Sequence, residues 1–261
     1  MNRKSCSIFM GLCVLALSCL CIAPASAQQD SQVKEKPPLY TYVSNWQIPR
    51  AHWADIMKER DATKSILDKA LSDGTLVGYG SDENLVHRPD GYTHDDWWSS
   101  MSMAGLLKVL DQFYTSGNSD TPALETATKH EDEVLVSRYY NWHSGSYQNA
   151  DLQVALYKLK ADAPDDAVDL LSKTLVVPLM EKLLADGTIA EYEIDTEAVH
   201  TDAPGSFDIV WVAANPEAVD KVNAALRSAM AAQPLGGPAF LSMIDFSKHR
   251  DELWRAMGVY K

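Results

Sequence analysis

Residues 67–79 read LDKALSDGTLVGY, and residues 180–192 read MEKLLADGTIAEY. The two stretches align without a gap at a spacing of 113 positions. In both, a helical pattern leads into Asp-Gly-Thr, and the glycine suits the left-handed residue that often follows the last turn of a helix. The chain therefore carries two copies of one structural unit.

The same spacing continues beyond these stretches. It pairs Asp82 with Asp195, Val86 with Val199, His87 with His200, Asp95 with Asp208 and Trp98 with Trp211. Near the end of each copy the spacing shifts by a few residues, and TKHEDEV (128–134) then matches SKHRDEL (247–253). We interpret the pattern as an ancestral duplication whose insertions are confined to loops.

Each copy predicts the order β-α-β-β-α-β. The first strand and first helix are expected at 39–47 and 50–73 in one copy, and at 152–160 and 164–186 in the other. Two strands joined by a turn come next. They are followed by a second helix, at 103–114 and 216–230, and by a fourth strand that starts near Pro122 and Pro238.

The boundaries of the copies follow from these elements. Thr128 and Ser247 are good helix N-caps, so a short extra helix beginning Lys-His is expected after each fourth strand. The first copy then spans residues 39–138 and the second spans 152–261. Residues 139–151 between them are rich in aromatic, Ser, Gly and Asn residues, and we expect an ordered but irregular linker.

This α+β order is the ferredoxin-like arrangement. Two such units in tandem resemble the dimeric α/β-barrel superfamily, which includes antibiotic-biosynthesis monooxygenases, muconolactone isomerases and, as fused tandem units, relatives of chlorite dismutase and dye-decolorising peroxidase. The resemblance covers nearly all of the mature chain. It implies two four-stranded sheets that face each other around a shared interior, closed either within one chain as a monomer or between two chains as a homodimer.

The N-terminus has the pattern of an export signal. Arg3 and Lys4 precede an apolar run over residues 8–22, which closes on Ala25-Ser26-Ala27. This is typical of a secretory signal peptide (residues 1–27) cleaved after Ala27, and the run is shorter than the roughly 20 residues of a membrane span. We expect a periplasmic or secreted protein with no membrane span. A lipid anchor at Cys19 or Cys21 is the alternative, which the preceding residues fit poorly.

Composition excludes several classes of site and partner. All four cysteines lie within residues 1–27, so the mature chain has no disulfide, cysteine nucleophile or thiolate metal site. The net charge of −13 argues against nucleic acid and anionic lipid as partners. Residues 28–38 are polar and end in two prolines, and we expect a flexible arm there.

Aromatic residues recur in both copies at strand spacing. If their side faces the shared interior, it lines a pocket that suits a flat aromatic or apolar ligand. The candidate ligand-binding residues are Tyr42, Trp46, Tyr79, Trp98, Tyr192 and Trp211. The alternative is that the recurring tyrosines and tryptophans form the core that packs against the helices.

Two histidines are the candidate catalytic residues. Strand alternation places His87 on the same side as Tyr79, and His200 on the same side as Tyr192. Either histidine would act as general base in a cofactor-independent isomerisation or oxygenation, with the tyrosine as hydrogen-bond donor. In the alternative, His87 and His200 form structural pairs with Asp95 and Asp208 across the hairpin.

Cofactors are not predicted, although two minor alternatives exist. His87, His94 and Asp96 have the ligand types that zinc and iron prefer, and copy two has Phe207 in place of His94. The resemblance to haem-binding tandem relatives implies an axial histidine in the second copy, which would be His200 or His249. No haem motif supports that assignment.

Two functions from different classes follow. The first is an exported soluble protein that binds a small apolar or aromatic ligand between its two sheets. The second is a non-enzymatic envelope protein with a filled interior and a protein partner. A cavity of several hundred Å³ between the sheets would favour the first function.

Overall fold

The computed structural model describes residues 33–117, 122, 124–201, 204–232 and 236–260. The predicted signal peptide and the first residues of the predicted arm lie outside this range. None of the helices within the described residues has the length and apolar character that a membrane crossing requires.

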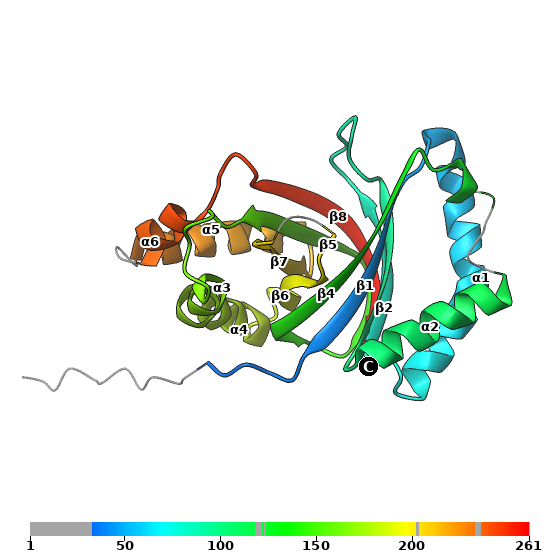
Figure 1. Cartoon of the computed structure of the whole chain (residues 1–261), viewed down its shortest axis with the longest axis horizontal. Helices are drawn as coiled ribbons and strands as arrows, with labels where there is room; N and C mark the ends of the chain where they lie inside the picture. Colours follow the sequence, from blue (N-terminus) through cyan, green and yellow to red (C-terminus); the bar gives the residue numbers. More distant parts are fainter. Residues whose placement is uncertain (1–32, 118–121, 123, 202–203, 233–235, 261) are drawn as a thin grey trace, which may run out of the picture. The chain divides into compact units, whose positions relative to one another are not determined.

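Eight antiparallel strands form a closed barrel in the order β1-β3-β2-β8-β5-β7-β6-β4. The strands are β1 (Leu39–Gln47), β2 (Gly78–Asn84), β3 (His94–Ser100), β4 (Lys129–Trp142), β5 (Gly145–Lys158), β6 (Ile189–Val199), β7 (Ser206–Ala213) and β8 (Arg250–Tyr260). Each copy supplies four neighbouring strands, and the pairs β2·β8 and β4·β6 join the two sheets. The predicted α+β fold of two facing ferredoxin-like sheets is therefore confirmed, and the barrel closes within one chain (Figure 1).

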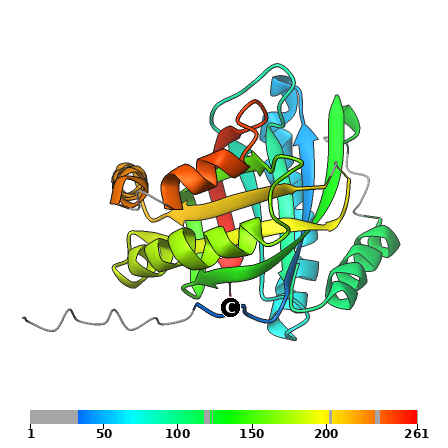
Figure 2. The same cartoon turned by 60° about the vertical axis from the view of Figure 1, so that its left-hand side comes forward.

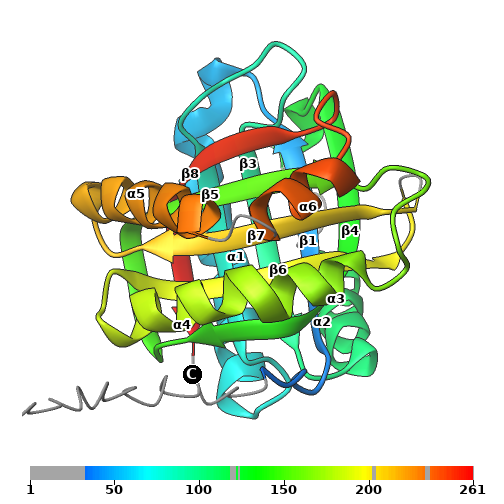
Figure 3. The same ribbon diagram turned by 90° about the vertical axis from the view of Figure 1, so that its left-hand side faces the viewer.

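Helices cover the outer face of each sheet. The first copy contributes α1 (Trp53–Ser72) and α2 (Met103–Ser116), and the second contributes α3 (Ala167–Leu171), α4 (Val177–Ala185), α5 (Pro216–Ala232) and α6 (Gly236–Met243). Short helical turns η1 (Arg50–His52), η2 (Leu124–Thr126) and the π-helical η3 (Ser172–Val176) complete the set. Figure 2 and Figure 3 show the helices of the second copy lying over its strands.

The helix ends confirm the local predictions. Gly74 and Gly187 follow α1 and α4 with φ angles of +77° and +74°, a conformation that glycine adopts at little cost. The Asn215 side chain accepts a hydrogen bond from the backbone N–H of Ala218 and so caps α5 (3.0 Å).

The predicted ends of the two copies are wrong. The segments that begin at Thr128 and Ser247 lead into strands β4 and β8 instead of extra helices, and the segments before them hold η2 and α6 instead of fourth strands. Glu131 and Glu133 line the barrel cavity, and His130 and Asp132 line a different cavity outside the barrel. A strand with polar residues on both faces does not show the apolar alternation that sequence reasoning looks for.

The predicted linker and arm also differ from the structure. Strand β4 continues to Trp142 and β5 begins at Gly145, so two residues separate strands where an irregular linker was expected. The described part of the arm is held against β4, because the backbone N–H of Lys36 donates to the carbonyl of Arg138 (2.8 Å).

Candidate functional site

The barrel encloses a cavity of about 570 Å³ between the two sheets. Strand alternation sends every second side chain of each strand toward it. On β1 these are Thr41, Val43 and Asn45, while Tyr42 and Trp46 line a cavity on the opposite side of the strand. The interior is therefore open, which favours ligand binding over the predicted filled interior of a structural protein.

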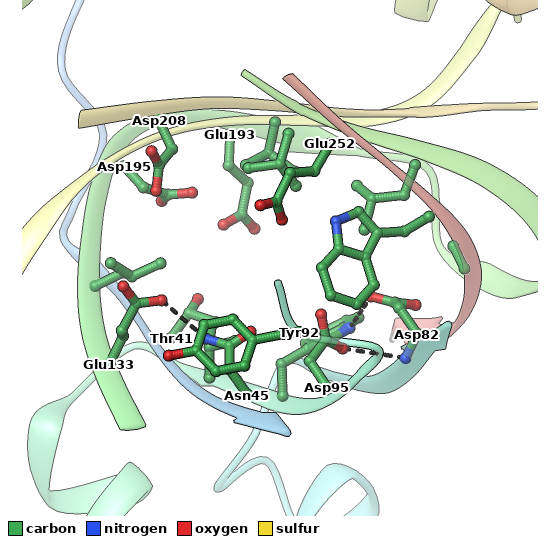
Figure 4. Close-up of a pocket in the computed structure, with 18 of the residues that line it drawn as sticks. Thr41, Asn45, Asp82, Tyr92, Asp95, Glu133, Glu193, Asp195, Asp208 and Glu252 are labelled. Carbon is green, nitrogen blue, oxygen red and sulfur yellow. Dashed lines mark hydrogen bonds between the residues drawn. The ribbon is translucent and has the colours of Figure 1, made fainter. Parts of the chain in front are cut away.

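Carboxyl groups dominate the lining of this cavity. Ten acidic residues line it: Asp82, Asp90, Asp95, Glu131, Glu133, Glu191, Glu193, Asp195, Asp208 and Glu252. Three basic residues line it: Arg88, Lys129 and Arg250. Figure 4 shows Glu193, Asp195, Asp208 and Glu252 on one wall, facing Asp82, Asp95 and Glu133 across the open space.

The remaining lining is apolar and aromatic. Strands β5 and β7 contribute aliphatic side chains, namely Leu152, Val154, Leu156, Val210 and Val212. Trp97, Trp254 and Tyr260 add rings from β3 and β8. An acidic surface and an apolar surface thus meet in one enclosed space.

Two of the three cavity-lining acids of β6, Glu191 and Glu193, have no counterpart in the first copy. Gly78 and Gly80 occupy the positions equivalent to Glu191 and Glu193. A Cβ atom at Gly78 would lie 2.4 Å from the Tyr260 ring, and one at Gly80 would lie 2.6 Å from the Trp97 ring. The glycines therefore make room for two large rings inside the barrel, and the glutamates face the cavity from the second copy.

Burial changes the protonation of the acidic cluster. Desolvation raises the pKa of Glu191 to about 8 and that of Glu133 to about 7. It raises the pKa of Asp82 and of Asp195 to about 6. At pH 7 Glu191 is therefore mostly protonated and Glu133 about half protonated, whereas Asp82 and Asp195 are mostly ionised.

Three further carboxyls are shifted more strongly. Desolvation raises the pKa of Glu193 well above its ordinary value, and the nearby charges of Asp195 and Glu191 add to the shift. The pKa values of Asp95 and Asp208 are raised for the same reasons, with Asp82 and Asp195 as the leading charged neighbours. Mutual repulsion thus reinforces desolvation across the cavity.

Two polar atoms in the lining are buried without a partner among the described residues. They are Oε1 of Glu193, which is 5% exposed, and Nε1 of Trp254, which is 2% exposed. A buried polar atom without a hydrogen bond costs free energy. The cavity thus presents an unused acceptor and an unused donor to a ligand.

Most of the predicted aromatic residues face the helices instead of this cavity. Tyr42, Tyr79 and Trp98 pack in one cluster with α1 and α2, and Tyr192 and Trp211 pack in the core of the second copy. The expectation that these residues line the shared interior is wrong, and the alternative of a helix-facing core is confirmed. Trp46 lies on the same outer side and stacks on His130 (3.7 Å between ring centroids).

The predicted catalytic histidines lie outside the cavity. His87 is exposed in the segment after β2, with its ring 5.0 Å from that of Trp53, and His200 is exposed directly after β6. Their predicted pairing with Asp95 and Asp208 is wrong, because Asp82 and Asp195 stand opposite those aspartates. The loops that join the paired strands are longer than the turns expected from the sequence, so the histidines lie beyond the last paired residues.

The predicted metal ligands are not brought together. Asp96 accepts hydrogen bonds from Arg60 and Ser81, and His94 lies edge-on to Trp53, with its pKa lowered to about 4 by burial. Among the described residues, no group of three or more metal-ligating side chains has a suitable arrangement.

The lining of the barrel cavity does not fit the haem alternative. No histidine is among those that line the barrel cavity, so no axial ligand of that type is available there. His249 instead stacks on Tyr157 (4.4 Å) and bonds through Nδ1 to the carbonyl of Leu156 (2.9 Å).

Comparisons with known proteins give the fold. No family model matches the sequence, and no curated protein matches it. Among solved structures, a candidate monooxygenase from Lactobacillus acidophilus superposes with a TM-score of 0.58 and 11% identity over 86% of this chain and 97% of its own. An anthrone oxidase-like protein superposes with a TM-score of 0.54 and 9% identity over 87% of this chain and 95% of its own.

Chlorite dismutase from Candidatus Nitrospira defluvii, in complex with imidazole, gives a TM-score of 0.51 and 12% identity over 84% of this chain and 90% of its own. At these identities the likeness concerns the fold and not the activity. The chain has the dimeric α/β-barrel fold that its internal repeat predicted.

Proposed function

We propose that this protein binds a small organic cation, an amine with an apolar or aromatic body, in the cavity between its two sheets. The observation that carries the proposal is the convergence of ten acidic side chains on one cavity that also has an apolar wall. The proposed ligand thus keeps the apolar or aromatic body that the sequence predicts and adds a positive charge.

The acidic cluster supplies the driving force. Ionised carboxylates buried close together repel each other and lose their hydration, which is why the pKa of Glu191 and that of Glu193 are raised. A bound ammonium group would lower the cost of ionising them, and Oε1 of Glu193 would accept one of its hydrogen bonds. Ligand binding and carboxyl deprotonation are therefore coupled.

The apolar wall argues for an organic cation over a bare metal ion. Leu152, Val154 and Val212 offer no ligand atom to a metal but bury the body of an amine. Trp97 and Trp254 can stack on an aromatic ligand or lie against its cationic group. The described residues include no group arranged to hold a metal.

Isothermal titration of the mature protein with phenethylammonium tests the proposal. The neutral 2-phenylethanol has the same shape without the charge, and we expect it to bind at least about tenfold more weakly. The variant Glu193→Gln should weaken phenethylammonium binding about tenfold or more, whereas the control Glu217→Gln on the outer helix α5 should not. Equal binding of amine and alcohol, or unchanged binding by Glu193→Gln, would overturn the proposal.

A second candidate is a cofactor-independent enzyme of the monooxygenase type. A carboxyl whose pKa is raised to about 8 is a stronger base than an ordinary carboxylate and accepts a proton once it is ionised, at slightly alkaline pH. Glu191 is such a group, hydrogen-bonded by the Tyr260 hydroxyl. Two of the similar structures are described as a candidate monooxygenase and an anthrone oxidase-like protein. Dioxygen uptake with anthrone, abolished by Glu191→Gln, would support this activity, and no uptake would reject it.

We also propose that the protein acts outside the cytoplasm, on the basis of the signal-like residues 1–27. N-terminal sequencing of the protein recovered from the periplasm or medium should begin at Gln28. An N-terminus at Met1 in the cytoplasm would overturn this assignment.

A further inference from the structure

The two copies place acidic side chains at corresponding positions inside the barrel. Asp82 on β2 stands opposite Asp95 on β3, and Asp195 on β6 stands opposite Asp208 on β7. Both members of the second pair come 113 positions after their counterparts, which is the spacing of the repeat. All four side chains line the cavity.

A third acidic residue in each copy follows the same rule. Glu133 on β4 stands opposite Val43 on β1, and Glu252 on β8 stands opposite Val154 on β5. The two glutamates hold the same place in the matching segments TKHEDEV and SKHRDEL. Both line the cavity, so each copy contributes three carboxyl groups from equivalent places.

The strand order puts these groups on opposite sides of the barrel. In the ring β1-β3-β2-β8-β5-β7-β6-β4, strands β2 and β6 are four places apart, as are β3 and β7, and β4 and β8. Four places are half of a ring of eight. Figure 4 shows the result, with the first acidic set (Asp82, Asp95 and Glu133) facing the second acidic set (Asp195, Asp208 and Glu252) across the open space.

Few positive charges of the protein itself neutralise these two sets. Among the described residues, Glu252 is the only member in an ion pair, with Nε of Arg250 at 3.2 Å and a guanidinium nitrogen of Arg88 at 4.0 Å. Arg60 lies near the first set and donates to the backbone carbonyls of Asp82 (3.2 Å) and Asp95 (2.9 Å), not to their carboxyl groups. The third basic residue of the lining, Lys129, lies over the Tyr92 ring at 3.9 Å.

A buried acceptor next to the second set points to a ligand independently of the charge. Glu193 comes two positions before Asp195 on β6, and its Oε1 is buried without a partner among the described residues. Strand alternation places both side chains on the cavity side. An ammonium group bound to the second set would therefore also have this acceptor within its surroundings.

The space between the two sets has an apolar lining. Val43 and Val154 stand next to the two glutamates at equivalent places, and Val210, Val212 and Leu152 add aliphatic surface from β7 and β5. A hydrocarbon chain in this space is removed from water, which stabilises its binding. The cavity therefore has acidic ends and an apolar middle.

We propose that the ligand of the barrel carries two ammonium groups, one bound to each acidic set, joined by an apolar body that crosses the cavity. This inference rests on the cation binding proposed above and adds the second charge. Linking the two charges in one molecule makes the second contact intramolecular, so a diammonium ion gains affinity that two separate ammonium ions do not.

Straight-chain diammonium ions from butane to octane are suitable probes, each compared by titration calorimetry with the monoammonium ion of the same length. We expect one diammonium ion to bind per protein, at least about tenfold more tightly than its monoammonium partner at the best length. That advantage should pass through a maximum within the series, because the barrel fixes the separation of the two sets. An affinity that rises steadily with length, equally in both series, would show apolar burial alone and overturn the inference.

Variants on the two walls test whether both sets are used. Asp208→Asn removes a charge from the second set, and Asp95→Asn removes one from the first while keeping the oxygen that accepts from the backbone N–H of Asp82 (3.1 Å). Each variant should weaken diammonium binding about tenfold and lower its advantage over the monoammonium ion. The matched control is Glu217→Gln on the outer helix α5, which should change neither affinity.

The outcomes separate this inference from the cation site on which it rests. Binding of the monoammonium ions with no preference for the diammonium ions overturns the second charge and leaves the cation site standing. A diammonium affinity that responds to only one of the two wall variants, both being folded, also overturns it. Absence of binding by either series overturns both proposals.

Discussion

Asp82 and Asp95 stand directly opposite each other on β2 and β3, and both side chains line the barrel cavity. The second copy repeats the arrangement with Asp195 opposite Asp208. Like charges at directly opposed positions of a sheet are destabilising, and burial makes ionisation still less favourable. Two facing acid pairs at the centre of the barrel are therefore a cost to stability that a bound cation would relieve.

The stability of the protein without ligand should fall as the pH rises from about 5 to about 8. The pKa of Glu191 is raised to about 8 and that of Glu133 to about 7, both above the values of an unfolded chain. Between those limits the folded protein keeps protons that the unfolded chain has released, so rising pH favours unfolding, by on the order of 2 kcal/mol per carboxyl. Urea denaturation at several pH values measures the slope.

The matched variant is Glu191→Gln, because glutamine cannot ionise. The free energy of unfolding of this variant should change less with pH than that of the wild-type protein. His94 acts in the opposite sense, because its pKa is lowered to about 4, but its contribution is complete by about pH 6.5. A free energy of unfolding that rises from about pH 6.5 to about pH 8 would contradict the assignment of raised carboxyl pKa values.

The acid pairs also show how far sequence reasoning reached. The repeat spacing matched Asp82 to Asp195 and Asp95 to Asp208, so the signal for the site was present in the duplication. The sequence does not decide which face of each strand lies inside, and the candidate ligand site depends on placing the tyrosines and tryptophans there. In a strand of period two, the opposite placement moves every side chain to the other face.

The order of the strands and helices was easier to predict than which face of each strand lies inside the barrel. The first strand was predicted at its observed bounds, Leu39–Gln47, and the Asp-Gly-Thr turns end the helices as expected. Strands β4 and β8 were misplaced, because an interior lined by Glu131, Glu133 and Glu252 makes a buried strand resemble a polar segment. Both errors therefore have one cause, which is that the inside of this barrel is acidic.

Cation binding should release protons and strengthen with pH. Because the pKa of Asp82 and of Asp195 is raised to about 6, and that of Glu191 to about 8, the cavity gains negative charge across this interval. We expect the affinity for phenethylammonium to rise about tenfold or more between about pH 5.5 and about pH 8. Titration calorimetry in buffers of different ionisation enthalpy measures the protons released, and none released would contradict the coupling.

Replacing Gly80 by alanine should destabilise the fold by about 1–3 kcal/mol. The added Cβ would lie 2.6 Å from the Trp97 ring, which packs over this glycine inside the barrel. The cost should shrink when Gly80→Ala is combined with Trp97→Leu, and a double-mutant cycle from denaturation curves isolates that coupling. Additive effects of the two changes would show that Gly80 and Trp97 do not constrain each other.

The two copies share a tyrosine–carboxylate hydrogen bond with unequal surroundings. Tyr79 donates to Asp68 (2.5 Å), and Tyr192, 113 positions later, donates to Glu181 (2.6 Å). Both tyrosines are buried, but the acceptor Asp68 is about half exposed and keeps Lys64 as a partner, whereas the acceptor Glu181 is half-buried. Tyr192→Phe should therefore cost about 1 kcal/mol and Tyr79→Phe less, as measured by denaturation. The reverse order would contradict the role assigned to burial.

Replacing both His87 and His200 by alanine should leave phenethylammonium affinity within about twofold of the wild-type value. Both side chains are exposed and neither lines the barrel cavity, so their removal changes neither the acidic cluster nor the apolar wall. Stability should drop slightly, because the His87 ring contacts Trp53. If the protein turns over a substrate, a folded double variant that loses turnover but still binds phenethylammonium would restore the histidines as catalytic residues. Retained turnover would leave the proton-transfer role to a cavity carboxyl such as Glu191.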